Sequence, residues 1–170
     1  MRESDLVKMA KGGDKEAFCR LYSLYKDRLY RYAYYRLGNY DDAQDAVSDC
    51  IVSAYEQIKN LRRAEAFSSW IFKILYAACS AYIKQQMRQR ELDDIDSARQ
   101  SSNLFTIMDE SKTELAQALD ILSSDEKEIV LLSVVGGFTS KEISKITGLT
   151  AGSVRSKLSR SLAKMRNYLE

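Results

Sequence analysis

The thirteen residues Thr150–Leu162, TAGSVRSKLSRSL, hold four serines, two arginines and a lysine, and they contain no acidic residue. From Val154 onward, apolar side chains recur every three or four positions, which is the spacing of one side of an α-helix. The opposite side carries short hydroxyls and long cations. A solvated surface helix has the same pattern. We expect a helix with one cationic outer face and a buried stripe of Val154, Leu158, Leu162, Met165 and Leu169.

The residues just upstream, FTSKEISKITGLT, predict a second, shorter helix. Thr139 and Glu142 have the spacing of a capping box, and Gly148 stands where a left-handed residue closes a tight turn. Thr150 then caps the following helix. Two helices joined in this way indicate a helix-turn-helix, whose second helix enters the DNA major groove. Its arginines and lysine can reach guanine, and its serines can reach phosphates. The candidate DNA contacts are Gly152, Ser153, Arg155, Ser156, Lys157, Ser159 and Arg160.

The composition of the 170 residues argues against an enzyme. The chain contains no histidine, and it has three cysteines that are far apart in the sequence. A zinc site or a histidine-based triad is therefore excluded, no phosphate-binding glycine loop is present, and no cofactor is expected. The three cysteines are expected to be buried, reduced thiols of a cytoplasmic protein: Cys19, Cys50 and Cys79.

No membrane insertion is expected from the hydropathy pattern. The first fourteen residues lack the apolar core of a signal peptide. The longest uncharged run, Ile129–Ser140, has twelve residues, which is too short to span a bilayer.

The chain has no proline and no alternating strand pattern, so we predict an all-α protein. Asp14–Leu37 forms one long helix that Gly38 ends. Asp41 caps a second helix that reaches Ile58, and a third helix covers about Ala66–Arg90. Four more helical segments are expected: Thr113–Leu122, Asp125–Val135, and the two helices of the helix-turn-helix.

The charge distribution divides the chain into three parts. Residues 1–90 hold sixteen basic and eleven acidic residues, whereas residues 113–170 hold eight and seven. Between them, Glu91–Lys112 holds six acidic and two basic residues, with serines interspersed. This composition is typical of a mobile linker. We predict two small helical domains, 1–90 and 113–170, joined by a flexible acidic linker over 91–112.

Two features of the first domain indicate binding surfaces. The second helix carries acidic residues at helical spacing, which suit either an ordinary solvated face or docking of a basic partner. On the third helix, Phe72, Lys73 and Tyr76 are expected to share an exposed side, while Trp70 is expected in the core. Aromatic rings beside cations suit stacking of unpaired bases. The preceding loop adds Arg62 and Arg63.

The order of these parts resembles a bacterial RNA polymerase sigma factor, in its short extracytoplasmic-function (ECF) form. The segments that carry the resemblance are FCRLYSLYKDRLYRYAYYRL, DDAQDAVSDCIVSAYEQI, FSSWIFKILYAACSAYIKQQMRQ and EKEIVLLSVVGGFTSKEISKITGLTAGSVRSKLSRSLAKMR. They cover most of the chain outside the linker.

The resemblance implies a role for each surface. The acidic helix corresponds to the segment that docks on core RNA polymerase, with Asp42, Asp45, Ser48 and Asp49. The loop Leu61–Glu65 and the third helix correspond to the part that melts and reads the −10 promoter element, with Arg62, Arg63, Lys73, Tyr76 and Lys84. The last helix corresponds to the reader of the −35 element. An anti-sigma factor is an expected third partner, beside polymerase and promoter DNA.

The sequence also departs from the family pattern. Ser48 and Asp49 replace a frequent Gln-Glu pair, and Ala77 and Ala81 stand where Asn and Asp are frequent. Ser123 replaces a usual proline, although Ser123 and Glu126 can form a capping box. Two alternatives therefore stay open: a stand-alone helix-turn-helix regulator of duplex DNA, and a degenerate sigma factor that melts promoters poorly.

Overall fold

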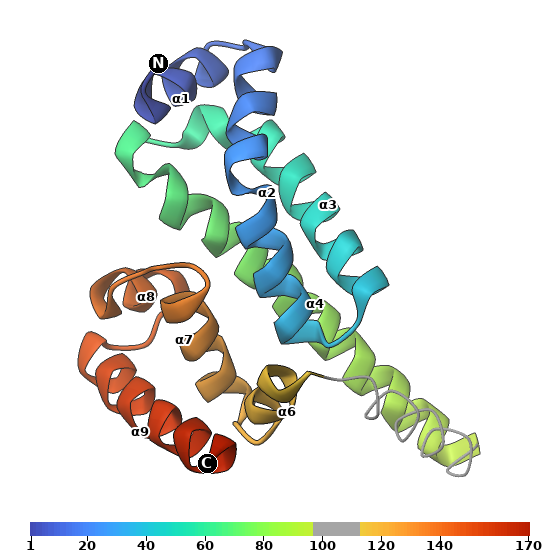
Figure 1. Ribbon diagram of the computed structural model, residues 1–170. Coiled ribbons are helices and arrows are strands. Elements are labelled where there is room, and N and C mark those ends of the chain that lie inside the picture. Colours follow the sequence, from blue (N-terminus) through green and yellow to red (C-terminus); the bar gives the residue numbers. More distant parts are fainter. Residues whose placement is uncertain (97–112) are drawn as a thin grey trace.

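The computed structural model describes residues 1–96 and 113–170, and all their regular elements are helical, as predicted (Figure 1). The N-terminal unit, residues 1–96, contains α1 (Glu3–Lys11), α2 (Lys15–Leu37), α3 (Tyr40–Gln57) and α4 (Phe67–Asp96). Two short 3₁₀ turns, Ile58–Asn60 and Ala64–Ala66, connect α3 to α4. The C-terminal unit, residues 113–170, contains α6 (Glu114–Asp120), α7 (Ser124–Val134), α8 (Ser140–Thr147) and α9 (Ala151–Leu169).

The long helix α2 is the centre of the N-terminal unit. It packs against α1, α3 and α4. Its buried side includes five residues that recur every three or four positions: Phe18, Leu21, Tyr25, Leu29 and Tyr32. Tyr25 donates a hydrogen bond of 2.7 Å to Glu3 of α1, a helix that the sequence did not lead us to predict. Burial of the phenol, together with this hydrogen bond, raises the pKa of Tyr25 to about 12.

The start of α3 differs from the prediction. Asn39, not Asp41, is the N-cap, because the Asn39 side chain accepts hydrogen bonds from the backbone amides of Asp41 and Asp42 at 2.8 and 3.1 Å. Asp41 instead lies in the first turn of the helix. An acidic residue there still interacts favourably with the positive end of the helix dipole. The predicted end of α2 at Gly38 is confirmed, and this glycine adopts φ 72°.

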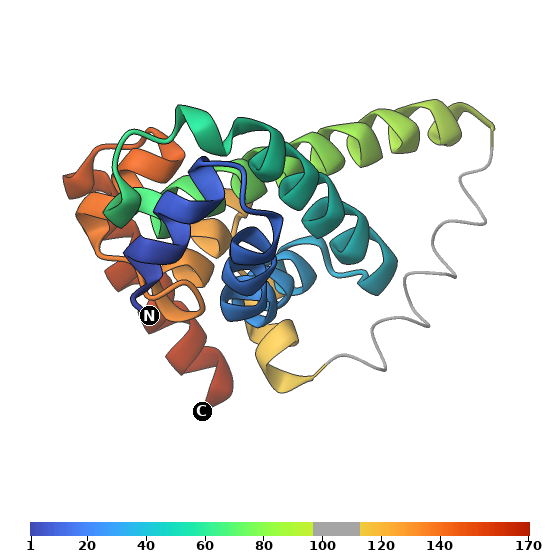
Figure 2. The same ribbon diagram turned by 90° about the horizontal axis from the view of Figure 1, so that it is seen from above.

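Helix α4 is longer than predicted. It continues past Arg90 to Asp96 and projects beyond the other helices (Figures 1 and 2). Acidic residues with isolated serines suggested a linker from Glu91 onward, but Glu91–Asp96 still follow the helix. The predicted mobility of the linker concerns mainly residues 97–112, which lie outside the described part of the chain.

One described stretch, Ala64–Asp93, is long and apolar enough to cross a membrane by length and composition. Lys73 interrupts the apolar sequence, so this stretch contains no long run of uncharged residues. Ile71, Phe72 and Leu75 of this stretch are fully buried among the other helices. A core helix of a water-soluble protein meets the same criterion, so this finding is weak evidence for a membrane span.

The cysteines are free thiols, as predicted, but they are not all buried. Cys50 and Cys79 lie in the core of the N-terminal unit, whereas Cys19 is exposed. Cys19 follows the buried Phe18, and one step along a helix turns a side chain by about 100°. That rotation carries Cys19 out of the buried stripe.

The two units pack against each other through two pairs of helices. α2 contacts α7, and α4 contacts α8 (Figures 1 and 2). Phe72 of α4 meets Phe138, in the turn before α8, edge to face with ring centroids 5.0 Å apart. The described residues therefore form one connected hydrophobic core instead of two separate ones.

Candidate nucleic-acid and partner-binding surfaces

The helix-turn-helix is confirmed, and local hydrogen bonds fix its geometry. Thr139 and Glu142 form the predicted capping box at the start of α8, with distances of 3.0 and 3.2 Å. Gly148 ends α8 with φ 85°, a conformation that residues with a Cβ atom rarely adopt. Thr150 then caps α9 by accepting a hydrogen bond from the Ser153 amide at 3.2 Å. The capping box thus fixes the start of α8, and Gly148 and Thr150 fix the turn from which α9 leaves.

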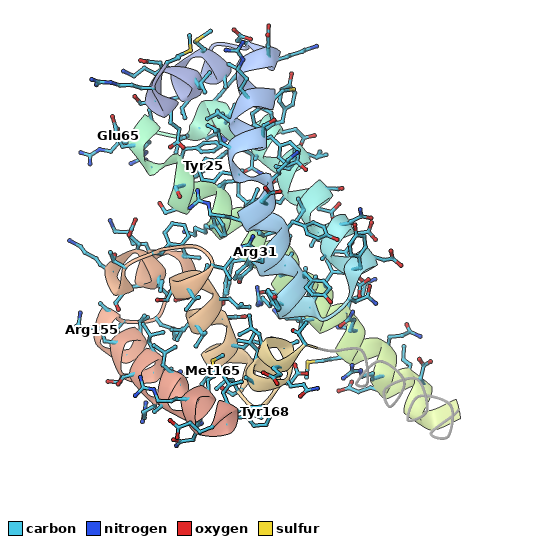
Figure 3. The ribbon with its side chains drawn as sticks, viewed as in Figure 1. Tyr25, Arg31, Glu65, Arg155, Met165 and Tyr168 are labelled. Carbon is cyan, nitrogen blue, oxygen red and sulfur yellow. The ribbon has the colours of Figure 1, made fainter. Side chains whose placement is uncertain are left out.

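The outer face of α9 is open to solvent. Of the seven predicted DNA contacts, five are exposed and two, Ser153 and Lys157, are half-buried. Figure 3 shows Arg155 pointing away from the rest of the molecule. A shallow hollow of about 450 Å³ lies on this face, lined by Arg155, Ser156, Ser159 and Arg160. The structure therefore brings the predicted residues together on one accessible cationic surface, although Lys157 also pairs with Asp125 at 3.8 Å.

The inner side of α9 differs from the predicted stripe. Val154 and Met165 are buried, but Leu162 and Leu169 are 38 % and 51 % exposed. Between Val154 and Met165 the fully buried position is Ser161, which donates a hydrogen bond of 3.2 Å to Glu126 of α7. A polar side chain can be buried at this place because the carboxylate satisfies its hydroxyl. Apolar periodicity alone could not identify Ser161.

The loop before α4 displays two of the predicted −10 cations. Leu61 and Ala64 are buried, and they anchor the exposed Arg62 and Arg63 between them. Lys73 of α4 is exposed beside the same loop, and Lys84 is exposed further along the helix. A pocket of about 360 Å³ is lined by Arg62, Arg63, Lys73, Trp70 and also Lys145 of α8. Lys145 was not predicted, because only the packing of the two units brings it to this loop.

Two aromatic residues of α4 lie elsewhere than expected. Phe72 was predicted to be exposed, but it is fully buried between Tyr32 and Phe138. Tyr76 is half-buried, with the Arg36 guanidinium 4.8 Å from its ring centroid. The periodicity of α4 predicts a single buried stripe that leaves out Phe72 and Tyr76, but Tyr32 of α2 and Phe138 of the C-terminal unit cover Phe72 as well. Phe72 is therefore not available for base stacking in this conformation.

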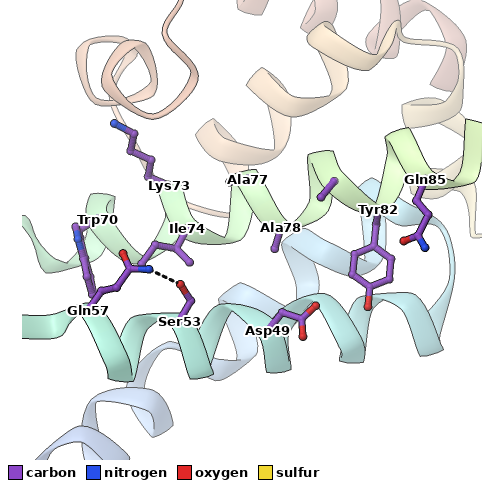
Figure 4. Close-up of a pocket in the computed structure, with 11 residues that line it drawn as sticks. Asp49, Ser53, Gln57, Trp70, Lys73, Ile74, Ala77, Ala78, Tyr82 and Gln85 are labelled. Carbon is purple, nitrogen blue, oxygen red and sulfur yellow. Dashed lines mark hydrogen bonds between the residues drawn. The ribbon is translucent and has the colours of Figure 1, made fainter. Parts of the chain in front are cut away.

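A groove of about 780 Å³ runs between α3 and α4. Figure 4 shows Trp70 at one end and Tyr82 and Gln85 toward the other, with Asp49 on the side of α3. Trp70 is half-buried and lines the groove, so the prediction of a core position was only partly right. Ala77 and Ala81 also line the groove and contribute no polar group to it.

The acidic face of α3 lies on the outside of the molecule. Asp45, Ser48 and Asp49 are exposed, and Asp42 is half-buried, where its carboxylate accepts a hydrogen bond from Gln86 of α4. Partial burial and these three nearby carboxylates raise the pKa of Tyr82, since both disfavour a phenolate. The four predicted docking residues therefore lie along one side of α3, next to the groove.

The residue pair that sequence reasoning missed entirely is Arg36 and Glu128. Their side chains form an ion pair between α2 and α7, and the two residues are only 7 % and 6 % exposed. Arg36 lies in the last turn of α2, where a surface cation near the helix C-terminus is the ordinary expectation. Nothing in its local sequence marks it as buried.

A helix-turn-helix with an open cationic face, joined to a helical unit that bears an acidic face and a basic loop, defines a DNA-binding protein of transcription. The sigma-70 region 2 family matches residues 21–89, and the sigma-70 region 4 family matches residues 112–165. The chain belongs to the sigma-70 family of RNA polymerase sigma factors, in its ECF group. Members of this family are initiation factors that direct RNA polymerase to promoters.

Similar proteins support this assignment over nearly the whole chain. The RNA polymerase sigma factor SigV of Bacillus subtilis is 32 % identical over 151 residues, which are 85 % of this chain and 86 % of that protein. The ECF sigma factor SigW of the same organism is 22 % identical over 96 % of this chain and 94 % of its own. Among solved structures, CnrH bound to the cytosolic domain of CnrY has the same fold, with a TM-score of 0.73, 21 % identity and coverage of 98 % and 96 %. RpoE of Bartonella quintana, in complex with the anti-sigma factor NepR, also has the same fold. Its TM-score is 0.71 and its identity 22 %, over 89 % of this chain and 96 % of that chain.

Proposed function

We propose that this chain initiates transcription through three separate surfaces. The exposed face of α9 reads the −35 element, the loop Leu61–Glu65 with α4 engages the −10 element, and the acidic face of α3 docks on core RNA polymerase. We assign to these surfaces the residues that the sequence analysis predicts for them. Phe72 is excluded because it is fully buried. The observation that carries the proposal is the placement of opposite charges on different helices of one chain. The cationic faces suit DNA phosphates, and the acidic face suits a basic protein surface.

We divide the chain accordingly into a domain of residues 1–96 that docks and melts, and a domain of residues 113–170 that binds duplex DNA. No step in this function calls for catalysis by the chain itself, and polymerase supplies the active site. The chain would act in the cytoplasm, where polymerase and promoter DNA are found. An anti-sigma factor is a further proposed partner, since RpoE of Bartonella quintana, which has the same fold, is described in complex with the anti-sigma factor NepR.

Transcription in vitro tests this function directly. The purified chain is added to core RNA polymerase from a related bacterium, with a library of promoter fragments as template. We expect transcripts from a subset of fragments that core polymerase alone does not use. Binding to duplex DNA without any such transcript, and without binding to core polymerase, would instead indicate a stand-alone regulator.

A weak melting activity is a second candidate, and Ala77 and Ala81 favour it. Both face the groove beside the proposed −10 surface, where they offer no hydrogen bond to an extruded base. A sigma factor of this kind would use a promoter with a pre-opened −10 region far better than a fully paired one. Equal use of the two templates would exclude this second candidate.

A further inference from the structure

Four cationic side chains meet in the pocket between the loop before α4 and helix α8. Arg62 and Arg63 come from the loop, Lys73 comes from α4 and Lys145 comes from α8. The loop and α4 belong to the N-terminal unit, whereas α8 belongs to the C-terminal unit. The pocket therefore concentrates positive charge from segments that are far apart in the sequence.

No described residue neutralises these four charges. The residues that line the pocket include no acidic side chain, and none of the four cations forms an ion pair with any residue that the structure describes. Figure 4 shows Lys73 pointing away from α3, which carries the acidic face. By contrast, Lys157 and Lys164 of α9 are both paired with carboxylates of α7. A cleft lined by one sign of charge concentrates ions of the opposite sign, so this pocket attracts an anion.

The same pocket has an aromatic wall. Trp70 is half-buried and lines both this pocket and the groove between α3 and α4. The buried Phe67 lies against it, with ring centroids 5.9 Å apart, and so limits the movement of the indole. Asn60 and Ser69 add neutral hydrogen-bonding groups to the lining. A nucleobase can stack on the indole while its edge or its sugar meets these neutral groups.

The size and the chemistry of the pocket define a ligand class. Its volume of about 360 Å³ falls within the range of small-molecule sites, about 300–1,000 Å³. Clustered arginines and lysines suit a chain of phosphates, because arginine binds phosphate oxygens through paired hydrogen bonds and lysine binds them as a point charge. A nucleoside di- or triphosphate carries a base and several phosphates in one small molecule. A −10 strand explains the loop cations but not Lys145, because α8 belongs to the unit that we assign to the −35 element.

We propose that this pocket binds a nucleoside di- or triphosphate, with its base on Trp70. Its phosphates bind the four cations that line the pocket: Arg62, Arg63, Lys73 and Lys145. The loop cations and Lys73 also belong to the proposed −10 surface, so the nucleotide and the −10 strand exclude each other. A rise in the nucleotide concentration then reduces engagement of the −10 element. This competition rests on the proposed function, whereas the nucleotide site itself does not.

Fluorescence of Trp70 tests the site directly. Trp70 is the only tryptophan of the chain, so its emission reports on this pocket alone. The purified chain, without polymerase or DNA, is titrated with GTP and separately with ATP, and it is excited beyond the absorption band of the nucleotides. Salt at about 150 mM screens weak surface attraction. We expect a saturable change in emission with a micromolar Kd, and the absence of saturation with both nucleotides would overturn the proposal.

Fragments of the nucleotide separate its two parts. Tripolyphosphate lacks the nucleoside, and guanosine lacks the phosphates. We expect GTP to bind at least fivefold more tightly than either fragment, since the pocket contacts both parts and a stacked base alone contributes that much. Equal affinities for tripolyphosphate and GTP would show that the pocket holds any polyanion, and would overturn the assignment to a nucleotide.

A matched pair of variants on α8 tests the contribution of the C-terminal unit. Lys141 and Lys145 are both exposed, but only Lys145 lines the pocket. Loss of one charge-assisted hydrogen bond in Lys145→Ala should raise the Kd for GTP about tenfold. Lys141→Ala removes the same charge outside the pocket and should change this Kd less than twofold. Equal Kd values for the two variants would indicate unspecific attraction and would overturn the site, and circular dichroism checks that both variants fold.

Displacement of single-stranded DNA tests the competition. A labelled oligonucleotide from a promoter that the transcription assay identifies is bound to the chain, and GTP is added while fluorescence anisotropy is recorded. GTP should release the oligonucleotide, and Lys145→Ala should require about tenfold more GTP while its affinity for the oligonucleotide stays that of wild type. Retention of the oligonucleotide at saturating GTP would overturn the competition. If no oligonucleotide binds, the proposed −10 function fails, while the titration of Trp70 still decides the nucleotide site.

Discussion

The hydroxyl of Ser161 donates a hydrogen bond to Glu126 Oε2 at 3.2 Å, so the residue that caps α7 also holds α9. Glu126 completes the capping box with Ser123 and accepts from the Lys164 ammonium at 2.9 Å. One carboxylate therefore joins the first turn of α7 to the middle of the proposed recognition helix. The ionised carboxylate therefore stabilises the packing of α9 on α7.

The first prediction concerns stability at acidic pH. The Lys164 ammonium and the Ser123 amide hold the pKa of Glu126 at about 2, below its ordinary value of 4.5. A lowered pKa means that the ionised form stabilises the folded chain above about pH 4.5, and that this stabilisation is lost as the pH falls toward 2. Urea unfolding at pH 6, 4.5 and 3 should show a steeper loss of stability for wild type than for Glu126→Gln. Parallel pH profiles for the two proteins would contradict this role of Glu126.

The second prediction concerns the turn after α7. A Cβ atom at position 136 would lie 2.6 Å from the carbonyl oxygen of Leu132 and 2.7 Å from the ring of Phe138. Because a backbone oxygen cannot move aside easily, Gly136→Ala should lower the free energy of unfolding by about 1–3 kcal/mol. Gly12→Ala is the control, since its nearest contact would be 3.4 Å and its effect should stay within about 0.5 kcal/mol. Chemical denaturation measures both, and equal effects would show that the turn relaxes around the added methyl group.

The third prediction concerns DNA reading by α9. Arg160→Ala should weaken binding to a cognate −35 duplex by about 1–3 kcal/mol if its guanidinium reads a guanine edge. Arg166, exposed in the last turn of the same helix, is the control, and its removal should affect all sequences alike. Fluorescence anisotropy on cognate and scrambled duplexes separates the two cases. An equal loss on both duplexes would make Arg160 a phosphate contact only.

The fourth prediction concerns docking on polymerase. Asp49 is exposed, so Asp49→Arg should change the free energy of unfolding by no more than about 0.5 kcal/mol. At a docking interface the same change opposes like charges at a cost of several kcal/mol, which lowers association at least a hundredfold. Asp27→Arg, at an exposed position of α2, is the control. Thermal melting and co-purification with core polymerase check both variants, and wild-type association of Asp49→Arg would remove α3 from the docking surface.

The fifth prediction concerns thiol reactivity. Burial raises the pKa values of Cys50 and Cys79 to about 12, so neither thiol is ionised or accessible near neutral pH. Cys19 is exposed. A thiol reagent at pH 7.5 should therefore add rapidly at one site in the native chain and at three sites after unfolding. Mass spectrometry counts the labels, and rapid double labelling of the native chain would mean that the core of the N-terminal unit opens readily.

Local sequence signals correctly predicted the helix caps and helix ends that depend on interactions between residues close in sequence. The capping boxes at Thr139 and Ser123, the helix end at Gly148 and the cap at Thr150 each depend on residues within four positions of one another. The same holds for the exposed cations of α9, because a helix with one apolar side must turn the other side toward water. The all-α fold and the helix-turn-helix could therefore be read from the sequence alone.

Local signals were less reliable where a neighbour competes for the same role. Asn39 caps α3 in place of Asp41, since its side chain reaches two backbone amides at once. Ser161 takes a buried position that apolar periodicity would give to Leu162, because Glu126 lies opposite it. In both cases the deciding group is a hydrogen-bond partner, which a pattern of apolar residues does not show.

Only the tertiary structure decided how the two units meet. Phe72 and Tyr76 fall outside the apolar stripe that the sequence predicts for α4, so the sequence indicated an exposed aromatic surface. The C-terminal unit covers that side and buries Phe72 against Phe138, with Arg36 paired to Glu128 beside it. These partners are 66 and 92 positions apart, and no periodicity within a helix depends on residues so distant in sequence. The sequence alone thus determined the helices and their charged faces, whereas packing between distant helices decided which faces remain accessible.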